Sequence, residues 1–193
     1  MNTLVKVENL TKERLEHITT QIGEAFASEK GGIRDIISHH TLREYIKIAT
    51  EIAYESGYLY TIDYKGYIVF YPKNKKIPLR YHFKKAYKVL KRIPFSEVCK
   101  YIKGISGWIG YEKIYRKQDY IAVFMLAIPL EFQGQGRMKP LLSHAFAEAE
   151  KKGVPCVLDT DTELKQDKYI KCGMHLKRKQ LLKSGISVYV MER

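Results

Sequence analysis

The chain has 193 residues, of which 45% are hydrophobic and 28% are charged, as is typical of a globular protein. Its 34 Lys and Arg residues against 21 Asp and Glu give a formal net charge of +13. We therefore expect one domain that attracts anions such as phosphorylated cofactors, nucleic acid or acidic lipids. The longest uncharged apolar run, residues 120–130, is too short to span a bilayer, so no membrane partner is expected.

The cysteines and the N-terminus bear on the compartment. Cys99, Cys156 and Cys172 are scattered and form no CxxC pair or Cys/His cluster. This pattern favours reduced thiols, and hence a cytoplasmic protein without disulfides or a structural metal. Residues 1–15 carry no apolar signal core and no small-residue cleavage site, which agrees with that interpretation.

The first 72 residues predict two helices and a hairpin. Thr11 can cap a first helix, which ends at the glycines of residues 28–32. A second amphipathic helix is expected over about 41–56. Two runs rich in Tyr, Ile and Val then surround a Lys-Gly pair, so residues 57–72 predict a β-hairpin with its turn at that pair.

Residues 72–117 form a basic belt, with fourteen Lys and Arg against two Glu, or +12. The belt is expected to be helical over 79–90 and 96–105, because Pro94 suits the start of the second helix. It could be either a solvated face or a surface that attracts anions. Its aromatic residues could stack nucleic-acid bases, although their helical spacing with Leu and Val favours burial; they are Tyr81, Phe83, Tyr87, Phe95 and Tyr101.

The second half of the chain alternates strands and helices. Residues 119–128 predict a buried strand, which a helix and a further strand at 154–160 follow as a βαβ-like unit. A short helix then ends at Gly173, and two strands close the chain. The whole pattern predicts a mixed α+β (α/β-like) domain.

Gly134 and Gly136 lie between the strand and the helix of this unit. A helix N-terminus has N–H groups without intrahelical partners, and glycines let phosphates approach the backbone closely. Pro140 is tolerated near a helix start, so the helix should begin close to Gly136. Neither the dinucleotide fingerprint GxGxxG nor the phosphate loop GxxxxGK[ST] is present, since Lys139 occupies the third glycine position.

The stretch "LAIPLEFQGQGRM" resembles the acyl-CoA-binding motif of the GCN5-related N-acetyltransferase (GNAT) superfamily, Arg/Gln-x-x-Gly-x-Gly/Ala, through Gln133, Gly134 and Gly136. The later stretch "LDTDTELKQDKYIKCGM" is similar to a second family landmark and puts Tyr169 and Gly173 at its tyrosine and glycine positions. Met138, Thr162 and Met174 depart from the family pattern, in which Gly or Ala, Asn and Phe are usual.

The resemblance implies a GNAT fold, with a central mixed, mostly antiparallel β-sheet flanked by helices, in a single domain over residues 1–193. It covers 119–193 as the acetyl-CoA-binding half, and 1–118 fits loosely as the variable, substrate-side half. It also implies an acetyl-CoA-dependent N-acetyltransferase, in which an amine attacks the thioester directly in a ternary complex. Acetyl-CoA would be the cosubstrate, no metal would be needed, the amine acceptor is unidentified, and the protein would be a monomer or homodimer.

The resemblance also assigns roles to residues. Tyr169 would be the general acid for the leaving thiolate, because a phenol is protonated at neutral pH, although it could instead be a core aromatic. The base is not fixed; Glu131 and Asp159 are tentative candidates, with Asp161 and the histidines His39, His40 and His82 behind them. The expected cofactor-binding residues are Ala127, Ile128, Gln133, Gly134, Gln135, Gly136, Arg137, Met138 and Thr162.

Two other functions remain open at this point. The chain could be a nucleic-acid- or ribosome-associated binding module on a GNAT fold, in which the basic belt supplies the contacts. It could also be a sensor that binds acyl-CoA without turnover, and for that function the tyrosine hydroxyl would not be needed.

Overall fold

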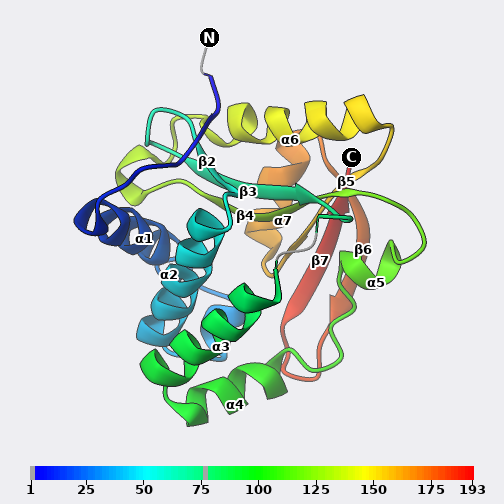
Figure 1. The fold of residues 1–193 in the computed structure, drawn as a ribbon. Helices are drawn as coiled ribbons and strands as arrows, with labels where there is room; N and C mark the ends of the chain where they lie inside the picture. Colours follow the sequence, from blue (N-terminus) through cyan, green and yellow to red (C-terminus); the bar gives the residue numbers. More distant parts are fainter. Residues whose placement is uncertain (1–2, 76–77) are drawn as a thin grey trace.

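A computed structural model describes residues 3–75 and 78–193; Lys76 and Ile77 of the basic belt lie outside the described residues. A seven-stranded sheet forms the centre, in the order β1-β2-β3-β4-β5-β7-β6 (Figure 1). Neighbouring strands are antiparallel except for β4 and β5, which are parallel and joined by helix α6. The mostly antiparallel α+β sheet predicted from the sequence is therefore confirmed. Its strands are β1 (Val5–Lys6), β2 (Leu59–Thr61), β3 (Tyr67–Pro72), β4 (Ile121–Ala127), β5 (Cys156–Thr160), β6 (His175–Leu181) and β7 (Ser187–Glu192).

Helices cover both faces of the sheet. On one face, α6 (Met138–Lys152) and the end of α7 (Glu163–Lys171) enclose a core built from Leu141, Leu142, Phe146, Ile121 and Met191. On the other face, α1 (Lys12–Ala27) and α2 (His39–Glu55) enclose a second core, in which Ile18, Ile22, Leu59, Val69 and Met125 are buried. The sheet is thus the middle layer of three.

The predicted helix starts follow from local chemistry. The Thr11 hydroxyl accepts a hydrogen bond from the Arg14 N–H at 3.2 Å, which caps α1 as expected. Ser38 caps α2 in the same way through the Thr41 N–H at 3.1 Å. Gly173, with φ of +96°, follows α7 in the left-handed conformation that favours glycine.

The β2–β3 hairpin is confirmed, but its turn is not at the Lys-Gly pair. Asp63 and Tyr64 reverse the chain, with φ of +54° and +55°. Gly66 serves helix packing instead, since a Cβ there would lie 2.8 Å from Cδ1 of Leu141 on α6. The glycine is therefore needed for a close approach between sheet and helix, which a turn prediction does not reveal.

Strand β4 contains an irregularity that shapes the molecule. Val69 of β3 pairs with Met125, whereas Phe70 pairs with Val123, so Phe124 is an extra residue without a partner in β3. Such a bulge bends its strand and changes which side chains face each side of the sheet. On the other edge, β4 pairs with β5 at Ile121 and Ala122. The two parallel strands are not paired beyond this point.

The basic belt forms three helices: α3 (Leu79–Arg92), α4 (Phe95–Gly104) and the short α5 (Tyr111–Ile114). Pro94 precedes α4, as predicted. The expected burial of the belt's aromatic residues is wrong for Phe83, Tyr87 and Phe95, which are exposed. The reason is that α3 packs on α2 through its polar side, so none of its described residues is buried. Across the described chain, no helix is both long and apolar enough to cross a membrane.

Helix α3 is attached to α2 through a buried carboxylate. Glu51 is 6% exposed and accepts from Lys88 Nζ at 2.5 Å and from Arg92 Nη1 at 2.7 Å. Burial opposes ionisation of Glu51, but these two cations outweigh it and lower the pKa of the carboxyl. These two ion pairs therefore fix the position of α3 against α2.

We predict that Glu51→Gln lowers the free energy of unfolding by about 3 kcal/mol, because it leaves two cations facing a neutral amide. Denaturant unfolding at neutral pH measures this loss. Glu148→Gln, which removes a surface pair with Lys152 at 3.5 Å, is the matched control and should cost less than about 1 kcal/mol. Equal losses in the two variants would show that the contacts of Glu51 with Lys88 and Arg92 do not hold α3 in place.

Candidate active site

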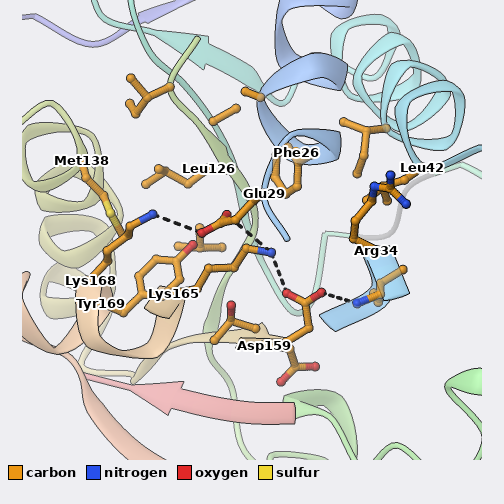
Figure 2. Close-up of a pocket in the computed structure, with 18 of the residues that line it drawn as sticks. Phe26, Glu29, Arg34, Leu42, Leu126, Met138, Asp159, Lys165, Lys168 and Tyr169 are labelled. Atoms are coloured by element: carbon orange, nitrogen blue, oxygen red, sulfur yellow. Dashed lines mark hydrogen bonds and ion pairs between the residues drawn. The ribbon is translucent and has the colours of Figure 1, made fainter. Parts of the chain in front are cut away.

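A cavity of about 560 Å³ opens where β4 and β5 part. Val123, Phe124 and Leu126 line it from β4, and Asp159 and Thr160 line it from β5. Helices α1, α2 and α4, the N-terminus of α6 and helix α7 supply the remaining walls. Figure 2 shows side chains from these elements converging on the opening. The ends of two parallel strands at a point of separation are a common place for a ligand site.

The glycine loop forms one edge of this cavity. Gly134 and Gly136 have φ of +75° and +68°, a conformation that other residues rarely adopt. A Cβ at either position would meet no atom within 4 Å, so the space beside the loop is open. Within the described chain, no hydrogen bond uses the backbone N–H groups of residues 134–137. These donors are thus available to an anion beside the start of α6.

Helix α6 begins at Met138, two residues later than expected from Pro140. Pro140 is consequently the third residue of the helix, where its missing N–H costs no hydrogen bond. The Met138 side chain packs against the core on the α6 face and also lines the cavity. The N-terminus of α6 carries Arg137, whose guanidinium lies 5.6 Å from the centre of the Phe132 ring.

The structure brings most of the sequence-predicted site residues together. Glu131 lies on the exposed turn η2 (Leu130–Phe132), where it accepts from Gln21 at 2.9 Å outside the cavity lining. Thr162 caps α7 through the Lys165 N–H at 3.2 Å and is likewise outside the lining. Gln135 lines a small adjacent cavity of about 150 Å³. The predicted residues that do line the main cavity are Ala127, Ile128, Gln133, Gly134, Gly136, Arg137, Met138, Asp159 and Tyr169.

Tyr169 projects from α7 toward the cavity, beside Glu29 and Lys168 (Figure 2). Burial raises the pKa of its phenol well above the ordinary value, and the negative charge of Glu29 adds to the shift. The hydroxyl is therefore protonated at neutral pH. Met138 of α6 and Tyr169 both pack against the same core cluster, so the ring is supported by side chains as well as by its helix.

Asp159 has an unusual protonation equilibrium. Burial raises the pKa of its carboxyl to about 7, although the Tyr111 N–H, which donates to Oδ1 at 3.0 Å, opposes the shift. The negative charge of Glu112 raises the pKa further. Gly110 allows this contact, since a Cβ there would lie 2.2 Å from Asp159 Oδ2. A carboxyl that titrates near neutrality inside a cavity can accept a proton during a reaction.

An ion-pair network that the sequence analysis missed crosses the cavity from α7 to the segment after α1. The Glu29 carboxylate accepts from Lys168 Nζ at 3.1 Å (Figure 2). The Asp161 carboxylate accepts from Lys165 Nζ at 2.7 Å. Asp161 also accepts from the Ile33 N–H at 2.8 Å. Asp161 is thereby committed to structural contacts and is a weaker candidate for a base. Asp161 and Lys165 are only four positions apart in the sequence, but Glu29, the partner of Lys168, is 139 positions away from it.

The remaining wall of the cavity is aromatic. Tyr45 of α2 and Tyr101 of α4 pack with their ring centres 5.4 Å apart, and Trp108 also lines the cavity. Among the described residues, the Trp108 indole N–H is buried without a hydrogen-bond partner. An unpaired buried donor beside a cavity is available to a polar atom of a bound molecule. No sequence pattern marked these three residues as neighbours.

The other titratable candidates lie elsewhere. Cys172 is buried in the core, as expected for a small structural residue. His39 lies 3.4 Å from Glu24 at the start of α2, and His82 is exposed on the outer helix α3. None of these side chains lines the cavity in the described structure.

Comparison with known proteins identifies the fold. No protein-family model matches the sequence, and no curated protein matches it significantly. The structure is similar to arylalkylamine N-acetyltransferase 2 from Aedes aegypti, at 13% identity and a TM-score of 0.60 over 100% of this chain and 99% of that one. A protein described as histone acetyltransferase HPA2 and related acetyltransferase, from Corynebacterium glutamicum, aligns at 15% identity and a TM-score of 0.60 over 98% and 94% of the two chains. The C-terminal condensation domain of Ebony, in complex with beta-alanyl-dopamine, aligns at 12% identity and a TM-score of 0.55 over 100% of both chains. At these identities the similarity establishes architecture, and the chain has the fold of the GCN5-related N-acetyltransferase superfamily.

Proposed function

We propose that the protein is an acetyl-CoA-dependent N-acetyltransferase that moves the acetyl group directly to an amine. The observation that carries this proposal is a glycine loop with free N–H groups, which opens onto a cavity that also contains Asp159 and Tyr169. The loop suits a pyrophosphate, and the two side chains suit proton transfer. The comparison structures support acetyl transfer through their fold.

The cofactor would lie between the ends of β4 and β5. Its phosphates would contact the N–H groups of residues 134–138, where the α6 dipole adds partial positive charge. Its pantetheine arm would follow the end of β4 at Ala127 and Ile128. Met138 differs from the Gly or Ala of the family motif, but its side chain packs into the core and leaves the backbone donors accessible.

Three groups would carry the chemistry. Asp159, with a pKa near 7, would take a proton from the ammonium form of the acceptor. The Ile128 N–H, which has no acceptor in the described chain, would stabilise the oxyanion as the amine nitrogen bonds to the thioester carbon. Tyr169 would then protonate the sulfur as the carbon–sulfur bond breaks. The excess proton that the nitrogen still carries would leave through water and restore the Tyr169 phenol, which yields the amide and CoA.

The acceptor side of the cavity suggests the kind of amine. Tyr45, Tyr101 and Trp108 offer aromatic surface, and Asp159 offers a negative charge at the end of β5. This combination favours a primary amine with an apolar or aromatic body.

The direct test is an acetyl-CoA consumption assay over amines of several classes, including aromatic amines, polyamines, aminoglycosides and peptide N-termini. Turnover with one class supports the transferase. Tight CoA binding without turnover on any amine would favour the sensor, and salt-dependent binding of RNA without CoA binding would favour the nucleic-acid module.

We predict that CoA at one hundred times its Kd stabilises the fold by about 2.7 kcal/mol, and that Gly136→Val abolishes the effect. A valine side chain would occupy the open space beside the loop where the phosphates belong. Thermal melts with and without CoA measure both results. Gly185→Val is the matched control, since Gly185 has φ of +86° with open space around it but lies in the β6–β7 turn. An unshifted wild-type melt at millimolar CoA would refute the cofactor assignment.

For Tyr169→Phe we expect kcat to fall by about 10²–10⁴, because the leaving thiolate loses its general acid. The ring is retained, so CoA affinity and Tm should hardly change. Steady-state kinetics with an identified acceptor measures the loss. Tyr120→Phe removes the hydroxyl of a buried tyrosine outside the cavity and should leave kcat unchanged. Full activity of Tyr169→Phe would mean that another group or water protonates the sulfur.

Because its pKa is raised, the ionised Asp159 carboxyl lowers the stability of the folded protein at pH values above the ordinary pKa of aspartate. Between about pH 4 and 7 the folded carboxyl keeps a proton that the unfolded chain releases, so stability falls as pH rises through this window. Asp159→Asn should therefore raise Tm relative to wild type at pH 8 but not at pH 4. Each kcal/mol regained corresponds to roughly 2–4 °C for a chain of this size.

The control for this titration is Asp161→Asn, which removes the ion pair with Lys165 and should lower Tm at pH 8. Melts of the three proteins across the pH range give the comparison. An Asp159→Asn advantage that is the same at pH 4 and pH 8 would show that the wild-type carboxyl does not titrate near neutrality.

A further inference from the structure

Helix α3 packs against the protein with its polar side. Tyr81 donates to the Glu55 carbonyl at 2.8 Å, and Lys85 donates to the Tyr45 hydroxyl at 3.1 Å. Lys88 and Arg92 bind the buried Glu51. These four residues recur at helical spacing and define one face of α3. Most surface helices expose their polar face to water. In α3 the polar face instead contacts the protein and holds the helix in place.

The opposite face of α3 is apolar and exposed. It carries Leu79, Phe83, Tyr87 and Leu90, whose exposed fractions are 67%, 68%, 63% and 67%. Their spacing of four, four and three residues places them on one stripe of the helix. Helix α4 continues the exposure with Phe95 and Ile102. In Figure 1 helices α3 and α4 lie beside and below α2, at the lower edge of the view. A group of large apolar side chains that are exposed to solvent together indicates a binding surface.

The charges around this apolar stripe are of one sign. Helix α3 contains no acidic residue, and Arg80, Lys84 and Lys91 border the stripe on one side. The whole belt from 72 to 117 contains only Glu97 and Glu112 against its fourteen cations. An apolar stripe bordered by Lys and Arg is the arrangement of helices that lie in the interface of an anionic bilayer.

We propose that α3 docks on the surface of an anionic phospholipid bilayer, with Leu79, Phe83, Tyr87 and Leu90 inserted among the headgroups. The neighbouring Arg80 and Lys91 would contact lipid phosphates and carboxylates. Attachment to α2 through Glu51 keeps the apolar stripe directed outward without a conformational change. This surface function does not depend on the transferase proposal, because none of these side chains lines the cavity.

A bilayer suits this surface better than the other possible partners. A second copy would bring two belts of +12 together, and like charges oppose that contact. Nucleic acid could stack on Phe83 and Tyr87, but Leu79 and Leu90 make up half of the stripe and offer no face for a base. The proposal also departs from the expectation of no membrane partner, which was based on the lack of a segment long enough to span a bilayer.

The test is co-sedimentation of the full chain with vesicles of phosphatidylglycerol and phosphatidylcholine, or of phosphatidylcholine alone, at about 0.1 M salt. Wild type should pellet with the anionic vesicles and stay in solution with the neutral ones. The double variants Phe83→Ser/Leu90→Ser and Arg80→Glu/Lys91→Glu should each weaken binding by about tenfold or more, since one loses apolar insertion and the other loses attraction.

Matched controls come from exposed residues outside α3. Leu164→Ser and Lys151→Glu make the same chemical changes on α7 and α6 and should alter vesicle binding by less than about threefold. Circular dichroism spectra and CoA-free melts show whether each variant folds. Because the mutated α3 side chains are exposed, their variants should melt like wild type.

Several results would overturn the proposal. Failure of the wild type to pellet with anionic vesicles would be one such result. Another would be a Phe83→Ser/Leu90→Ser variant that pellets as well as wild type, because charge alone would then account for vesicle binding. Binding of poly(U) RNA that is lost in the same variant, without vesicle binding, would make the stripe a base-stacking surface. A concentration-dependent dimer in sedimentation, lost in that variant and again without vesicle binding, would assign it to a second copy.

Discussion

The parting of β4 from β5 is the constraint on which the candidate site depends. Two parallel strands that remained paired would bury the groups at their ends, and no ligand could reach the backbone there. Pairing stops at Ala122, and the bulge at Phe124 changes the faces that the following residues present. The opening exposes Ile128 at the end of one strand and Asp159 on the other. Helix α6, which must cross between parallel strands, begins at the mouth of the same opening and brings the glycine loop with it.

Charge distinguishes the two ends of this opening. At the loop, glycines in the left-handed conformation and the start of α6 supply donors and partial positive charge, which suit phosphates. Elsewhere in the lining, Glu29, Asp159 and Asp161 carry carboxylates, which suit an ammonium group. Lys165 and Lys168 neutralise Glu29 and Asp161, whereas Asp159 has a backbone N–H as its partner. Asp159 is therefore the carboxyl whose protonation changes near neutrality. Glu29 and Asp161 form structural ion pairs, whereas Asp159 is available for proton transfer.

The basic belt shows that an amphipathic pattern does not fix which face of a helix is buried. A helix with four apolar residues on one side would usually place them in the core. Here Glu51 is buried beneath α3, and a buried carboxylate without partners is strongly destabilising. Lys88 and Arg92 satisfy it, and their position turns the stripe outward. The orientation of α3 is thus decided by one buried charge on another helix.

The sequence by itself determined the order of the longer strands and helices, the start of α4 after Pro94 and the glycine loop ahead of α6, but it did not predict β1 or α5. These features depend on local spacing, caps and backbone preference, which neighbouring residues encode. Tyr169, which lines the cavity, was singled out through the resemblance to a family landmark. The tertiary structure alone decided the bulge at Phe124, the raised pKa of Asp159, the pairing of Glu29 with Lys168 and the outward face of α3. Each of these arises from contacts between segments far apart in the chain, where burial sets the energy of a charge, and no local pattern carries that information.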